Sequence, residues 1–196
     1  MPPPPLPTSA EKASARRRQA LWRGLLLAVI CCLIWIAQNG RWTAESWQTP
    51  TAYQGDAYET LARIKAASEG DTLPLRPQLI ERLGAPFGAN WSTYPTPEKL
   101  QLLALGGIAH LTSVFVAANL GLMLVHLLNA LTFYWVVRRW LAVRWEWAGT
   151  GALLFSYNYA VFHRGLSHFS FVFSWVVPLG LLACWLVARS SRLRWR

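Results

Sequence analysis

Charged residues are scarce in this sequence, and acidic residues especially so. Of the 196 residues 14% are charged, with nine acidic residues against nineteen basic ones. The hydrophobic share is 54%, and twelve residues are tryptophan. This balance is too apolar and too aromatic for an ordinary soluble domain of this length, so it predicts a membrane protein.

Cysteine is also scarce. Cys31, Cys32 and Cys184 all lie inside apolar runs, where a thiol behaves as a small hydrophobic group. Their spacing fits neither a disulfide framework nor a metal site. The sequence therefore indicates no cofactor, and a divalent metal ion is left open rather than predicted.

The excess of basic residues gives a formal net charge of +10, which in a soluble protein would suggest binding to nucleic acid. Here the arginines gather beside apolar runs instead. They are Arg16, Arg17, Arg18, Arg23, Arg138, Arg139, Arg144, Arg189, Arg192, Arg194 and Arg196. This placement is typical of the cytosolic ends of membrane spans, so we expect the lipid bilayer as partner and no nucleic acid.

The apolar runs predict an all-α, polytopic protein of the inner (plasma) membrane with about four transmembrane helices. The predicted parts are a disordered cytosolic tail rich in proline and arginine over residues 1–20, transmembrane helices over 21–38, 114–141, 148–162 and 169–188, and a cytosolic basic end over 189–196. Both chain termini are then cytosolic.

A large external loop is predicted over residues 39–113. It holds seven of the nine acidic residues. Good helix formers predict a helix over 56–68, and Pro97 starts a predicted interfacial or re-entrant helix over 97–111, whose end Gly106 and Gly107 weaken. This loop is the only segment large enough for an extramembrane site.

Asp56 and Glu59 are the acidic residues of interest in that loop. Their spacing at the start of a predicted helix fits two interpretations. Asp56 could act as a general base with Glu59 as its catalytic helper, or Asp56 could be the helix N-cap with Glu59 completing a capping box. Glu59 is also spaced to pair with Arg63. The residues alone leave both interpretations open.

The predicted parts follow one another in a set order: one span, an acidic external loop, an interfacial helix and a long second span. This order resembles the N-terminal part of GT-C type integral-membrane glycosyltransferases. This superfamily includes protein mannosyltransferases and aminoarabinose transferases. The similar strings are Gly55-Asp56 before an alanine-rich helix, Arg82-Leu83-Gly84-Ala85-Pro86-Phe87-Gly88, and Arg164-Gly165-Leu166-Ser167-His168.

The resemblance implies a hexosyltransferase-type bacterial enzyme. It would transfer a sugar from a polyprenyl-phosphate donor to a lipid or cell-envelope acceptor on the external face. An acidic residue of the first external loop is commonly the catalytic base or acceptor organiser in that superfamily, and Asp56 is the matching position. Family members have more spans, so further membrane helices or a subunit would complete the fold.

A departing lipid phosphate requires positive charge nearby. The candidates for substrate binding in the short predicted loop near the membrane surface are Arg164, as the phosphate contact, and the flanking His163 and His168. The alternative for the two histidines is that they are polar interfacial residues. The alternative interpretation of Arg164 is an interfacial arginine whose side chain extends to the membrane surface. Arg82 and Tyr94 are weaker candidates for substrate binding, with a solvated charge and an interfacial aromatic residue as the alternatives.

Polar residues also lie within the predicted second span. Asn119, His126 and Asn129 fall broadly on one face of that helix, which predicts hydrogen bonds between membrane helices. A second function stays open beside the enzyme: a non-catalytic membrane subunit or a fragment that binds a lipid carrier or a partner membrane protein.

Overall fold

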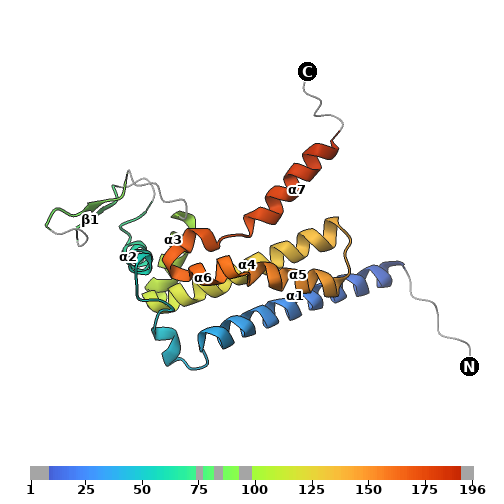
Figure 1. Ribbon diagram of the computed structural model, residues 1–196, viewed down its shortest axis with the longest axis horizontal. Helices are drawn as coiled ribbons and strands as arrows, with labels where there is room; N and C mark the ends of the chain where they lie inside the picture. The colour runs from blue at the N-terminus through green and yellow to red at the C-terminus, as the bar shows by residue number, and fades with distance from the viewer. Residues whose placement is uncertain (1–8, 74–76, 82–85, 93–98, 191–196) are drawn as a thin grey trace, which may run out of the picture.

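The computed structural model describes residues 9–73, 77–81, 86–92 and 99–190. This part of the chain is mostly helical, as predicted (Figure 1). The helices are α1 (Ser9–Asn39), η1 (Glu45–Gln48), α2 (Asp56–Glu69), α3 (Lys99–Leu111), α4 (Val114–Trp140), α5 (Trp145–Ser156), α6 (Tyr159–Arg164), η2 (Gly165–Val172) and α7 (Val176–Arg189). Strands β1 (Leu79–Ile80) and β2 (Ala89–Asn90) form a short antiparallel hairpin.

Two helices, α1 and α4, are long and apolar enough to cross a membrane. They include most of the first two predicted spans. The segment from Trp145 to Val172 and α7 form a third, broken candidate, bent by 56°. Neither 148–162 nor 169–188 is therefore one continuous helix.

Local sequence explains these breaks. The Asn158 side chain accepts a hydrogen bond from the Val161 amide and starts α6, and Gly165, with φ of 45°, ends it. Pro178 lies in the first turn of α7, where its missing N–H leaves no helical bond unmade. The C-terminal third is consequently a series of short helices.

The tail predicted as disordered over 1–20 is helical from Ser9 onward. Between Pro7 and Gly24 the chain has neither proline nor glycine, and it is rich in alanine and arginine. These residues favour a helix. The first helix therefore extends well beyond the apolar run that marks its membrane part.

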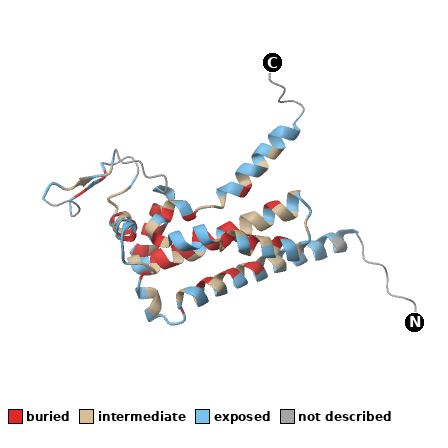
Figure 2. Ribbon diagram, viewed as in Figure 1, coloured by how far each residue is buried: buried red, intermediate tan, exposed pale blue. Residues whose placement is uncertain are grey.

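The helices pack most tightly at one end of the bundle. There α2 packs on α3, and both α2 and η2 contact α4. Buried residues gather around this junction, whereas α7 is largely exposed (Figure 2). Trp35, Ile64, Leu166 and Val172 are almost fully buried in this core. The opposite part of the bundle is held together by α1, α4 and α5.

The crossing of α2 and α3 depends on Gly106. A Cβ atom at this position would lie 2.6 Å from the Ala67 Cβ and 2.7 Å from the Ala67 backbone carbonyl carbon. Helix α3 continues through Gly106 and Gly107 to Leu111, where the predicted helix also ends. Gly106 allows α2 to approach closely.

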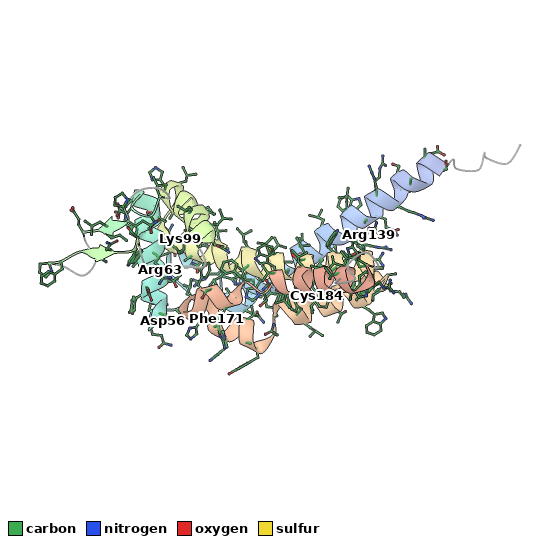
Figure 3. The ribbon with its side chains drawn as sticks, turned by 90° about the horizontal axis from the view of Figure 1, so that it is seen from above. Asp56, Arg63, Lys99, Arg139, Phe171 and Cys184 are labelled. Atoms are coloured by element: carbon green, nitrogen blue, oxygen red, sulfur yellow. The ribbon has the colours of Figure 1, made fainter. Side chains whose placement is uncertain are left out.

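Basic residues mark the other end of the bundle. Arg138 and Arg139 lie in the last turn of α4, Arg144 precedes α5, and Arg189 ends α7. Arg23 of α1 contacts the Trp145 ring at the start of α5. We call this the basic end, and the end with α2, α6 and η2 the polar end. Figure 3 shows Arg139 and Asp56 at opposite ends.

Candidate functional site

Asp56 is the first residue of α2, and Gly55 occupies the N-cap position. No side chain caps this helix, so the capping-box interpretation of Asp56 and Glu59 is wrong. Gly55 takes this position with φ of 55°, a conformation that favours glycine. The carboxylate of Asp56 is 64% exposed, and its Oδ2 lies 3.5 Å from Nδ1 of His168.

Glu59 has a different setting from Asp56. Its Oε1 lies 2.5 Å from Nη2 of Arg63 one turn along α2, as their spacing predicted. The guanidinium of Arg63 also lies 5.8 Å from the centroid of the Trp91 ring. Glu59 therefore forms an ion pair within α2. Asp56 is the acidic residue directed toward η2.

A buried hydrogen bond places Asp56 beside η2. The Thr60 hydroxyl, one helical turn after Asp56, donates to the Leu166 carbonyl oxygen at 3.0 Å. Ala57 and Ile64 are fully buried on α2. Thr60 and the apolar residues fix α2 against η2, so the Asp56–His168 contact follows from the packing of two segments that are distant in sequence. Figure 3 labels Asp56 of α2 and Phe171 of η2 at the same end of the bundle, and the two helices are in contact.

Aromatic rings hold the two candidate residues of α6. His163 stacks on Tyr159 at 5.1 Å between ring centroids. The Arg164 guanidinium lies 4.8 Å from the centroid of the Phe171 ring. Both side chains thus have a defined position close to the loop that begins at Gly165.

A cavity of about 260 Å³ lies at the polar end. Its wall combines the end of α1, the loop before α2, the middle of α4 and the α6–η2 turn. The lining residues are Trp35, Asn39, Thr51, Ala52, Gln54, Leu122, His126, Phe162, His163, Arg164, Gly165, Leu166 and Ser167. Asp56 and His168 lie outside the lining, each close in sequence to a residue that belongs to it.

The cavity thus brings His163 and Arg164 together with polar residues that the sequence did not single out, namely Asn39, Thr51, Gln54 and Ser167. The available signal was weak: these residues lie at helix ends or in connections, beside apolar runs. Arg82 and Tyr94, the other predicted binding residues, lie outside the described residues.

His126 forms part of the cavity wall from within α4. Its Nδ1 lies 2.9 Å from the Ser156 carbonyl oxygen, and its ring stacks on Tyr157 at 4.5 Å. A carbonyl oxygen only accepts hydrogen bonds, so Nδ1 carries the proton and Nε2 of the neutral ring is an acceptor. His126 therefore makes the hydrogen bond between helices that the sequence predicted.

Asn119 supports the loop that leads to the cavity. Its Nδ2 donates to the carbonyl oxygens of Trp47 at 2.9 Å and Thr49 at 2.8 Å. Arg41 donates to the Thr49 hydroxyl and the Ser46 carbonyl oxygen, and burial lowers the pKa of Arg41. The loop before Gln54 is thereby held in one conformation.

Asn129 has the same role for η2, because its Nδ2 donates to the Val172 carbonyl oxygen at 3.0 Å. Asn119 and Asn129 thus bind the backbone of a loop and of a 3₁₀ helix. The prediction that they join membrane helices to one another is wrong for Asn119, whose partners lie in η1 and the loop after it. It is supported for Asn129, because Val172 lies in the Trp145–Val172 segment of the third candidate span. Their buried amides replace backbone partners that these irregular segments lack.

Within the described ranges, no three His, Cys, Asp or Glu side chains gather closely enough to hold a metal ion. Asp56 and His168 form a pair, and the described residues supply no third ligand. The chemistry available at the site is therefore that of one exposed carboxylate, a neighbouring imidazole, and a cavity lined by a cation and hydrogen-bonding groups.

By the length and composition of α1 and α4, the chain has the character of a helical membrane protein. Comparison with protein-family models, with curated proteins and with solved structures finds no match.

Proposed function

We propose that the chain is a membrane glycosyltransferase, or its N-terminal portion, that transfers a sugar from a polyprenyl-phosphate donor to a lipid or cell-envelope acceptor. The observation that carries this proposal is the position of Asp56. Its exposed carboxylate contacts His168, which directly follows Ser167 in the lining of the 260 Å³ cavity, and Arg164 belongs to the same lining. A base and an anion-binding group are what displacement of a lipid phosphate requires.

In this mechanism Asp56 takes the proton of an acceptor hydroxyl or amine. The acceptor atom then forms a bond to the anomeric carbon of the sugar, while the bond from that carbon to the phosphate oxygen breaks. The phosphate leaves with the electron pair, and Arg164 compensates the negative charge that develops. His168, 3.5 Å from Asp56, acts as a positioning residue for the carboxylate.

The proposed orientation puts the polar end on the external face of the inner membrane, with both termini in the cytosol. The arginines at the basic end support this orientation, since such residues are enriched on the cytosolic side. A polyprenyl-phosphate sugar would then hold its chain in the bilayer and present its head group to the cavity.

The test is sugar transfer by the full chain in membrane vesicles supplied with a panel of radiolabelled polyprenyl-phosphate hexoses. Asp56→Asn should lower the initial rate by about 10²- to 10⁴-fold, the usual contribution of a positioned base. Donor binding should persist, because the substitution keeps the size of the side chain. Asp71→Asn, which alters an acid just beyond the far end of α2, is the matched control and should leave the rate unchanged.

Full transfer by Asp56→Asn would contradict the base assignment. A second candidate function is a non-catalytic subunit that binds a lipid carrier or a partner membrane protein. It is favoured by α7, where Leu181 is 68% and Val187 55% exposed, an apolar surface suited to further membrane helices. Donor binding without transfer by the unaltered chain would support this second function.

A further inference from the structure

An apolar cavity lies toward the basic end of the bundle, between α4, α5 and α7. Its volume is about 340 Å³, within the range of ~300–1,000 Å³ typical of small-ligand pockets. Every residue that lines it is apolar or aromatic, including Val136 and Trp140 of α4, Phe155 of α5, and Leu181 and Trp185 of α7. The cavity therefore fits a hydrocarbon chain.

Two arginines contact the rings of two tryptophans that line the cavity. The rings of Trp140 and Trp185 meet edge to face at 6.2 Å between centroids. The guanidinium of Arg139 lies 5.5 Å from the centre of the Trp140 ring, and that of Arg189 lies 4.3 Å from the centre of the Trp185 ring. These are cation–π distances, so both charges are held at the rim.

Arg139 and Arg189 differ from the neighbouring arginines in the partners of their guanidinium groups. Arg138 donates to the Val143 carbonyl oxygen, and Arg144 pairs with Glu146 at 3.2 Å. Among the residues that the structure describes, no carboxylate pairs with Arg139 or Arg189. The rim of the apolar cavity thus carries positive charge that the described protein does not neutralise.

We propose that this site binds an anionic phospholipid from the leaflet at the basic end. One acyl chain occupies the apolar cavity, and the phosphate lies against Arg139 and Arg189. Basic pockets between membrane helices recognise lipid head groups in this way. A zwitterionic lipid brings its own positive charge to the rim, and a free phosphate gains nothing from the apolar walls. The proposal is independent of the glycosyltransferase activity.

The test uses the full chain, purified in detergent and stripped of lipid. It is titrated with dioleoylphosphatidylglycerol, dioleoylphosphatidylcholine or inorganic phosphate, and bound ligand is counted by native mass spectrometry. Phosphatidylglycerol should bind with a Kd at least about tenfold lower than phosphatidylcholine, and inorganic phosphate should bind far more weakly than either lipid.

Matched pairs of variants separate the rim from general surface charge. Arg139→Gln with Arg189→Gln should raise the Kd for phosphatidylglycerol at least about tenfold. Arg138→Gln with Arg144→Gln removes the same charge from the same end and should change it less than about threefold, because both arginines already have protein partners.

A second pair tests the apolar walls. Leu181→Trp fills the cavity from an exposed helix and should also weaken binding of phosphatidylglycerol. Leu186→Trp, on the same helix but outside the cavity lining, should not. Equal losses in the two arginine pairs, equal affinity for both lipids, or no effect of Leu181→Trp would each overturn the proposal.

Discussion

The polar end and the basic end of the bundle use their polar residues in opposite ways. At the polar end Thr60, Asn119, His126 and Asn129 are buried, and each has a hydrogen-bond partner within the chain. At the basic end arginines lie outside the packed core, and three of them contact tryptophan rings. The first arrangement shapes a cavity. The second arrangement sets the orientation of the protein in the membrane and leaves positive charge available for contact with lipids.

This difference predicts how each end responds to substitution. A cavity walled by irregular segments needs every supporting contact, because loops and 3₁₀ turns leave backbone groups without regular partners. Exposed arginines are individually worth little to folding. Substitutions at the polar end should therefore affect stability and activity together, whereas substitutions at the basic end should affect lipid binding and orientation.

The largest expected effect on stability comes from Gly106→Ala. The new methyl group would lie 2.6 Å from the Ala67 Cβ and 2.7 Å from its backbone carbonyl carbon, so α2 must move away from α3. We expect a loss of about 3 kcal/mol in the free energy of unfolding, measured by denaturant titration in micelles, together with loss of sugar transfer.

Gly107→Ala is the control for this substitution, because a Cβ atom at Gly107 would meet no described atom within 4 Å apart from those of its own helix. It should stabilise α3 by up to about 1 kcal/mol. Equal unfolding free energies for the two variants would show that the close crossing of α2 and α3 does not support the polar end.

A smaller effect is expected for Asn119→Leu, which keeps the volume but removes the donor to the Trp47 and Thr49 carbonyl oxygens. Two unpartnered carbonyl groups should cost about 2 kcal/mol. Asn129→Leu removes one bond, to Val172, and should cost about 1 kcal/mol. Denaturant titration gives both values, and the reverse order would contradict the role given to the loop before Gln54.

Sequence alone predicts the elements that depend on local composition. The apolar runs locate α1 and α4, and good helix formers between Gly55 and Gly70 locate α2. The Glu59–Arg63 pair follows from helical spacing. In each case the information lies within a few turns of one helix, where periodicity and propensity are decisive.

The contacts that build the candidate site arise from tertiary packing. The approach of Asp56 to His168 depends on the hydrogen bond from Thr60 to Leu166 and on the room that Gly106 provides. No local pattern encodes either feature. The breaks between α5, α6 and η2 were missed for a related reason: hydropathy records an apolar run, whereas the Asn158 cap and the Gly165 conformation interrupt the helix.

The central claim is that the polar end and the basic end lie on opposite sides of the membrane, with the polar end outside the cell. Site-specific labelling tests this claim most directly. Cys31, Cys32 and Cys184 are replaced by alanine, and Gln54→Cys or Arg144→Cys is then introduced singly. Intact cells are treated with a membrane-impermeant maleimide. Gln54→Cys should be labelled in intact cells, and Arg144→Cys only after permeabilisation. Labelling of Arg144→Cys in intact cells, with protection of Gln54→Cys, would contradict the account.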